Sequence, residues 1–137
     1  MYGKTFSTLG KTLDPITQDS CAFYERTAIF ADYDGVANGP QEGINISKAL
    51  ADKDFLILQN HGILTTGSMI DTTIWYFLNM EDACKSQLIA ESVGKPIKIP
   101  HDVACKTRDY VANDLSAFVS LQPLLDLLWE EEKDFLD

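Results

Sequence analysis

Phe55-Leu56-Ile57-Leu58-Gln59-Asn60-His61-Gly62-Ile63-Leu64-Thr65-Thr66-Gly67 is the stretch that decides the fold of this chain. Two apolar runs flank a short polar break that ends in glycine, a pattern typical of two neighbouring strands joined by a tight turn. We therefore predict strands over residues 55–59 and 63–66. His61 lies in the break, where an imidazole can point out of a sheet. Neutral imidazole is the commonest protein ligand of zinc, so His61 is a candidate metal ligand.

The flanking sequence predicts helices around these strands. Gly67 ends the second strand, and Ser68 with Asp71 resembles a capping box that opens a long helix over residues 69–92. Further elements are a short helix over 3–9, a strand over 27–30, a helix from Pro40 to about 51, and helices over 101–119 and 122–136. No repeat or linker interrupts the chain, so we expect one domain over residues 1–137. Strands close together in sequence indicate an antiparallel α/β layer fold.

The long helix carries an apolar stripe at alternating four- and three-residue spacing. Its members are Ile70, Ile74, Phe77, Cys84 and Leu88. The stripe predicts that Phe77 packs on the sheet and that Trp75 faces elsewhere. Glu81 interrupts the stripe, and we interpret it as a residue at the edge of the buried face, paired with a lysine or arginine.

Composition narrows the class of protein. The 137 residues are 45% hydrophobic and carry a net charge of -10, which suits one soluble domain with a real core. The negative charge argues against nucleic acid and against an anionic membrane surface. No apolar run approaches the roughly 20 residues that span a bilayer. Cys21, Cys84 and Cys105 are widely spaced and odd in number, which predicts free thiols and a cytoplasmic protein. The acid-poor N-terminus leaves a weak organelle-targeting alternative.

The chain is poor in catalytic motifs. It contains no phosphate-binding glycine loop and no serine elbow. His101 is the second of only two histidines, and we expect it to be an ordinary surface residue without a cysteine at ligand spacing. Cys21 and Cys84 are expected to be packing residues. The acids that crowd the last twelve residues predict a solvated face. Judged by its residues alone, His61 is more often a turn histidine than a ligand.

Several phrases together resemble the class II aldolase/adducin family over about residues 2–92. They are the decisive stretch itself, Trp75 to Leu88, Tyr2-Gly3-Lys4, Leu13-Asp14-Pro15-Ile16-Thr17-Gln18-Asp19, and Gln41-Glu42-Gly43 with Lys48-Ala49-Leu50. The resemblance implies a three-layer α/β/α sandwich with a mainly antiparallel sheet, truncated at its N-terminus. It also implies that His61 corresponds to one of three zinc-binding histidines.

The other two family histidines stand in a His-x-His phrase just before the segment that matches Tyr2-Gly3-Lys4. Met1 therefore falls directly after the missing ligands, and the phosphate loops and the acidic catalytic residue also lie upstream. Gln18 falls where the sugar-phosphate aldolases place a tyrosine acid, and an amide cannot replace a phenol as a proton donor. We expect no tightly bound cofactor, with zinc bound only if the site is completed.

Three functions follow from the resemblance. The first is a truncated or remnant family member without independent catalysis, which self-associates through its exposed sheet edge and apolar face. The second is a zinc-dependent aldolase, epimerase or decarboxylase for a small hydroxy acid or sugar phosphate, completed by missing N-terminal residues or a family partner chain. There, zinc would polarise a carbonyl or enediolate oxygen. The third is an adducin-like module for a cytoskeletal partner, actin or spectrin, which the acidic C-terminus weakens.

Overall fold

The computed structural model describes residues 1–32 and 39–132. Three short strands form one sheet in the order β1-β2-β3, with β1 at Thr27–Phe30, β2 at Phe55–Leu58 and β3 at Gly62–Thr65. β2 and β3 pair antiparallel, with Phe55 opposite Thr65. Both predicted strands are confirmed, with their ends one residue earlier. The strand predicted over residues 27–30 is also present.

The sheet is mixed, which corrects the expectation of a mainly antiparallel one. β1 and β2 run parallel, with Thr27 beside Phe55 and Phe30 beside Leu58. A parallel pair needs a crossover connection, and here that connection contains helix α2, Pro40–Leu50. Of the two strand pairings in the described residues, one is therefore parallel and one antiparallel. The short distance in sequence between β2 and β3 correctly predicted their antiparallel pairing. β1 lies too far upstream for the same argument to apply.

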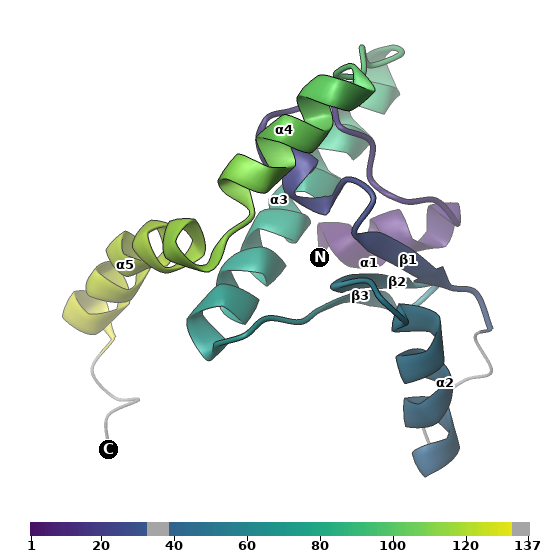
Figure 1. The fold of residues 1–137 in the computed structure, drawn as a ribbon, viewed down its shortest axis with the longest axis horizontal. Coiled ribbons are helices and arrows are strands. Elements are labelled where there is room, and N and C mark those ends of the chain that lie inside the picture. The colour runs from purple at the N-terminus through teal and green to yellow at the C-terminus, as the bar shows by residue number, and fades with distance from the viewer. Residues whose placement is uncertain (33–38, 133–137) are drawn as a thin grey trace.

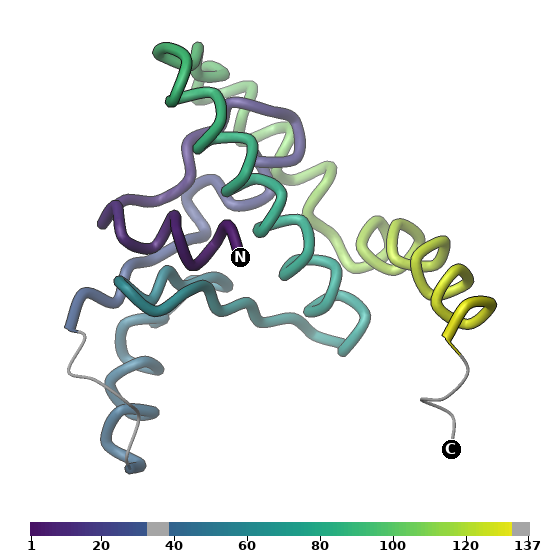
Figure 2. The backbone as a smooth tube through the Cα atoms, turned by 180° about the vertical axis from the view of Figure 1, so that it is seen from behind, coloured from purple at the N-terminus to yellow at the C-terminus, as the bar shows by residue number. Residues whose placement is uncertain are grey.

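Helices lie on both sides of the sheet (Figure 1). α2 contacts β1 and β2 from one side, whereas α1, Tyr2–Phe6, and α3, Ile70–Val93, contact each other and β3. Figure 2 shows the same arrangement from behind, with α1 against the middle of α3. The short 3₁₀ turns η1, Ser7–Leu9, and η2, Asp19–Phe23, complete the N-terminal segment. Gly10 ends the first helical segment in a left-handed conformation, as the sequence indicates.

The C-terminal region consists of α4, His101–Val111, and α5, Asp114–Glu131. α4 packs against η2, and α5 packs against α3. The predicted boundary near residue 120 is wrong, because the chain breaks at Ala112 and Asn113. Asn113 caps α5 by accepting a hydrogen bond from the Ser116 amide at 2.9 Å. Pro123 lies inside α5, and residues 133–137, with the end of the predicted last helix and part of its acidic tail, are outside the described residues.

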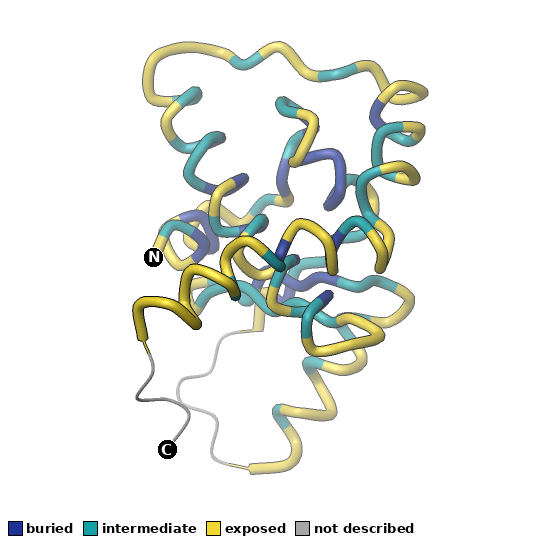
Figure 3. The backbone as a smooth tube through the Cα atoms, turned by 90° about the vertical axis from the view of Figure 1, so that its left-hand side faces the viewer, coloured by how far each residue is buried: buried dark blue, intermediate teal, exposed yellow. Residues whose placement is uncertain are grey.

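The core lies between the sheet, α1, η2 and α3. Phe55 is fully buried at its centre, and its ring makes edge contacts at 4.9 Å with the rings of both Phe23 and Tyr76. Arg26 covers this cluster with its guanidinium 5.0 Å from the Phe55 ring centre. In Figure 3 the burial concentrates in this region, while α2 and α5 are largely exposed.

α3 follows the predicted stripe only in its second half, where Cys84 is buried and Leu88 packs against the core. Its buried residues are Thr72, Tyr76, Met80, Ala83, Cys84 and Gln87. Ile70, Ile74 and Phe77 are exposed, with Phe77 at 43%, whereas Trp75 is partly buried against the core. The first half of the stripe was misassigned because α3 is apolar on more than one face and turns two polar residues, Thr72 and Gln87, inward. Spacing alone cannot choose between two such faces.

The predicted capping box at the start of α3 is also wrong. Met69 is the N-cap residue and makes no side-chain cap. The Ser68 hydroxyl instead donates to Asp114 Oδ2 at 2.7 Å, which ties the β3–α3 connection to the first turn of α5. No helix within residues 1–32 and 39–132 is long and apolar enough to cross a membrane.

Candidate functional site

His61 lies at the tight turn between β2 and β3. Its amide donates to the Leu58 carbonyl at 2.9 Å, and Asn60 before it adopts a left-handed backbone conformation with φ at 61°. Asparagine is one of the few residues that tolerates this conformation easily, which explains the Asn-His-Gly sequence. The Asn60 amide also donates to the Ser7 carbonyl at 3.3 Å and so fixes the turn against η1. The His61 side chain is exposed.

The described residues do not complete a zinc site around His61. Zinc in proteins takes three or four protein ligands from histidine, cysteine and carboxylate side chains. In residues 1–32 and 39–132, one group of three or more such side chains lies within ligand distance of one another, and His61 does not belong to it. A lone imidazole does not fit the family's metal, so we derive no chemical step through zinc in this chain.

We expected Glu81 to pair with a lysine or arginine, but its partners in the described part of the chain are backbone amides and the N-terminal amino group. Its carboxylate accepts hydrogen bonds from the amides of Tyr2 at 2.8 Å and Gly3 at 2.9 Å, and from the amino group of Met1. Partial burial favours a higher pKa, but these hydrogen bonds outweigh it and hold the pKa of Glu81 below its usual value. Glu81 therefore caps the first turn of α1.

Gly3 is required by this contact. A Cβ atom at Gly3 would lie 2.7 Å from Glu81 Oε1 and 2.9 Å from the Ile63 side chain. The Tyr2-Gly3-Lys4 phrase and Glu81 are therefore two parts of one arrangement, which joins the start of the chain to α3 and β3. Gly3 and Glu81 thus hold the start of α1 against α3, close to strand β3.

Gln87 joins the next part of the N-terminal segment to α3. It is fully buried, and its Oε1 accepts from the Asp14 amide at 2.8 Å while its Nε2 donates to Glu91 Oε1 at 2.9 Å. Glu91 in turn pairs with Lys11, and these hydrogen bonds lower the pKa of Glu91. Gln18 is exposed at the start of η2, and its comparison with the family's tyrosine acid stays a prediction.

Two of the three cysteines are packing residues, as predicted. Cys21 and Cys84 are fully buried, and burial raises the pKa of both thiols, that of Cys84 to about 12. Neither is therefore a ready nucleophile. All three cysteines are free thiols.

Cys105 has a different environment, which was not expected from the sequence. It lies one helical turn after His101 on α4, and both side chains meet Glu25 from the turn before β1. His101 is exposed, as expected, but it is not an isolated surface residue. The signal was present in the sequence, because His101 and Cys105 are four residues apart in a predicted helix and so share a face. Glu25 could not be placed with them from sequence.

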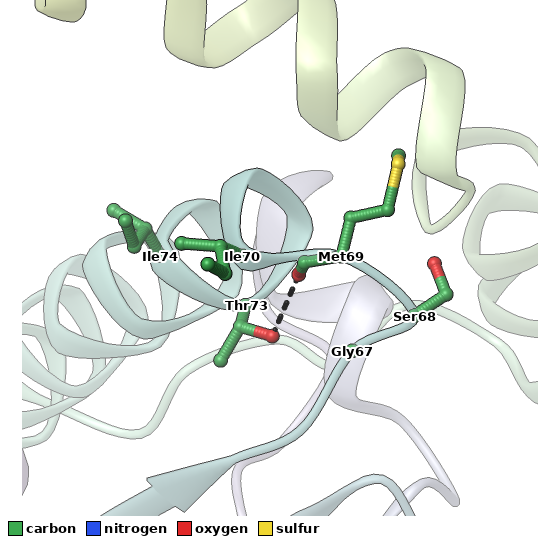
Figure 4. Close-up of a pocket in the computed structure, with 6 residues that line it drawn as sticks. All are labelled: Gly67, Ser68, Met69, Ile70, Thr73 and Ile74. Atoms are coloured by element: carbon green, nitrogen blue, oxygen red, sulfur yellow. Dashed lines mark hydrogen bonds between the residues drawn. The ribbon is translucent and has the colours of Figure 1, made fainter.

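An open pocket lies at the N-terminal end of α3 (Figure 4). It is lined by Gly67, Ser68, Met69, Ile70, Thr73 and Ile74. The Thr73 hydroxyl donates to the Met69 carbonyl at 2.9 Å, and the Ser68 hydroxyl is engaged with Asp114. No ionisable side chain lines this pocket, and its wall is mainly apolar. The pocket can therefore make apolar contacts, but its lining residues include no acid or base that could transfer a proton.

Known proteins share both the sequence pattern and the fold. Residues 1–88 match the Class II Aldolase and Adducin N-terminal domain. The chain is 34% identical over 134 residues to the decarboxylase NovR of Streptomyces niveus, covering 98% of the chain and 50% of that protein. It is 37% identical over 126 residues to the meiotically up-regulated gene 14 protein of Schizosaccharomyces pombe, covering 90% of the chain and 49% of the relative.

A solved structure agrees with these relatives. L-fuculose 1-phosphate aldolase from Glaciozyma antarctica superposes with a TM-score of 0.85 at 35% identity, covering 98% of this chain and 50% of the aldolase. The chain thus spans about half the length of the relatives that it matches. Because the family match covers well over half of the chain, the protein belongs to the class II aldolase/adducin family.

Proposed function

We propose that this chain supplies the frame and one metal ligand, His61, of a class II aldolase-type site, and that it carries out no lyase reaction by itself. The observation that supports this most directly is the setting of His61. The β2–β3 turn holds the imidazole in the open, yet within the described residues His61 belongs to no group of three potential metal ligands. The remaining ligands would come from residues outside these 137, in the same polypeptide or in a partner chain.

The completed site is the alternative function that we retain. The relatives include proteins named as a decarboxylase and as a sugar-phosphate aldolase, so the substrate class would be a small hydroxy acid or a sugar phosphate. The complete domain would be the three-layer α/β/α sandwich with a mainly antiparallel sheet that the family resemblance implies. Three free cysteines fit a cytoplasmic location.

An adducin-like role has less support. The chain is 31% identical to alpha-adducin of Rattus norvegicus over 87 residues, which covers 63% of the chain and 12% of the adducin. The similarity therefore concerns only a small part of the adducin chain. The acidic charge of this chain opposes a contact with an acidic cytoskeletal filament.

A chimera tests the proposed function. The N-terminal half of the Streptomyces niveus relative is fused ahead of Met1, and zinc per chain is measured at equilibrium for the chimera and for the chain alone. We expect the chimera to gain one zinc, and His61→Ala to remove that gain.

Asn60→Asp serves as the matched control, because it changes a neighbouring turn residue and leaves the imidazole of His61 in place. A well-folded chimera with no additional zinc would contradict the role of His61. Lyase activity of the unfused chain, lost on His61→Ala, would contradict the claim that the chain is inactive alone.

A further inference from the structure

Three side chains with metal-binding atoms converge where α4 meets the turn between η2 and β1. His101 and Cys105 lie one turn apart on that helix, and Glu25 reaches them from the turn between η2 and β1. His101 Nδ1 is 3.7 Å from Glu25 Oε1, and Cys105 Sγ is 3.8 Å from Glu25 Oε2. Cys105 Sγ is 3.9 Å from both ring nitrogens of His101. These contacts involve both oxygens of Glu25, and with one donor atom taken from each residue the three donors form a triangle whose sides are at most 4.8 Å.

This triangle is somewhat wider than one face of a tetrahedral zinc site. Zinc–ligand bonds of about 2.0–2.3 Å at the tetrahedral angle place neighbouring ligand atoms roughly 3.3–3.7 Å apart. The individual contacts of 3.7–3.9 Å lie close to that range, whereas the donors taken one per residue lie within 4.8 Å of one another. All three side chains are reachable from solvent, since the His101 and Glu25 side chains are 61% and 50% exposed. Only small side-chain adjustments would be needed to close the triangle on an ion.

The surrounding residues orient these donors. The Tyr24 hydroxyl lies 3.2 Å from His101 Nδ1, so it fixes the ring through this nitrogen and leaves Nε2 as the nitrogen that would bind the ion. Arg108 Nη1 lies 3.5 Å from Glu25 Oε2 and holds the carboxylate beside α4, although its charge also competes with a cation. Glu25 itself adopts a left-handed backbone conformation, with φ at 60°. That conformation is unfavourable for a glutamate, so the position of its carboxylate is maintained by these contacts.

We propose that Glu25, His101 and Cys105 form a zinc site with three protein ligands and a fourth position open to water. A thiolate, an imidazole and a carboxylate together favour zinc, whereas magnesium and calcium prefer oxygen ligands alone. Binding would release the proton of the Cys105 thiol to solvent, because only the thiolate coordinates. The site lies apart from the β2–β3 turn and shares no residue with it, so it is independent of the function proposed for His61.

Equilibrium titration of the intact chain with zinc, against a chelating indicator, tests this proposal. We expect one saturable zinc per chain, and Cys105→Ser, His101→Ala and Glu25→Gln should each weaken binding at least about tenfold. Asp102→Asn, which changes an exposed acid on the same helix, and His61→Ala should bind like the parent. Cobalt in place of zinc should show a thiolate-to-metal absorption band that disappears in Cys105→Ser.

Alkylation of the unmodified chain provides a test that needs no variant. Cys21 and Cys84 are buried, so a thiol reagent should modify Cys105 first, and saturating zinc should slow that reaction at least about tenfold because the coordinated thiolate is blocked. The proposal is overturned if zinc leaves the alkylation rate of Cys105 unchanged. It is equally overturned if ligand variants that melt like the parent bind zinc as Asp102→Asn does.

Discussion

Glu81 connects two parts of the chain that are almost eighty residues apart. Its carboxylate is four-fifths buried and receives two backbone amides from the first turn of α1. We predict that Glu81→Gln lowers the free energy of unfolding by about 1.5–3 kcal/mol, the usual value of hydrogen bonds to a charged group. Urea denaturation measures this change. Asp82→Asn, at the exposed neighbouring position, should change stability by no more than about 0.5 kcal/mol.

The Glu81 effect should depend on pH. The folded pKa lies below the unfolded one, which is about 4.3, so the carboxylate's stabilisation is complete well above pH 4.3 and is lost as the pH falls through the folded value. The stability difference between the parent and Glu81→Gln should therefore be constant near neutral pH and shrink in acid. A difference that grows in acid would contradict the hydrogen bonds described here. Matched urea titrations at pH 7 and near pH 3 decide.

Predictions for single residues succeeded where the environment of the residue is set by its neighbours in the sequence. The turn at His61 and the burial of Cys21 and Cys84 follow from their immediate neighbours. The partners of Glu81 and the meeting of Glu25 with His101 and Cys105 depend on contacts across the chain. No local pattern contains that information.

At the scale of elements, the long helix α3 is the instructive case. Its existence and its ends were predicted to within a residue, yet its buried face was predicted correctly only in the second half, at Cys84 and Leu88. Tyr76 and Met80 fill the core, and Thr72 and Gln87 are buried polar residues that an apolar stripe excludes. The parallel pairing of β1 with β2 and the break between α4 and α5 were likewise not predicted from the sequence, because both depend on tertiary packing and not on periodicity.

The corrected face of α3 gives a ranking of alanine variants. Trp75 is partly buried and its ring packs 5.2 Å from that of Tyr76, whereas Phe77 is 43% exposed. We predict that Tyr76→Ala costs about 3–5 kcal/mol, as for other buried aromatic side chains. Trp75→Ala should cost less than Tyr76→Ala and more than Phe77→Ala, which should cost about 1 kcal/mol. Chemical denaturation of the three variants gives the order, and a more damaging Phe77→Ala would restore the face expected from the sequence.

At the scale of the whole molecule, the described residues leave many large apolar side chains exposed. Exposed apolar residues on α3 and α5 include Ile70, Ile74, Phe77, Leu78, Leu115, Phe118, Val119, Leu124, Leu127 and Leu128. The three-stranded sheet also ends at β1 and β3, which are short edge strands. Large exposed apolar surfaces mark sites of association. We propose that the isolated chain self-associates despite its net charge of -10.

Light scattering at moderate salt tests this association. The parent chain should exceed the mass of a monomer, and Ile70→Lys with Ile74→Lys, both in the wall of the open pocket at the start of α3, should reduce that mass. Tyr110→Lys, which is 81% exposed on α4, is the control and should leave the mass unchanged. A parent chain that remains a compact monomer at all concentrations would contradict the proposal.

The central claim is that His61 alone gives this chain no family zinc site. The most direct measurement is equilibrium zinc binding in a Cys105→Ser background, at zinc concentrations too low to fill the separate site on α4 once this substitution has weakened it. We predict no saturable zinc in Cys105→Ser, and the same result in Cys105→Ser with His61→Ala. One zinc per chain in the single variant that disappears in the double variant would contradict the account, because His61 would then have ligands within this chain.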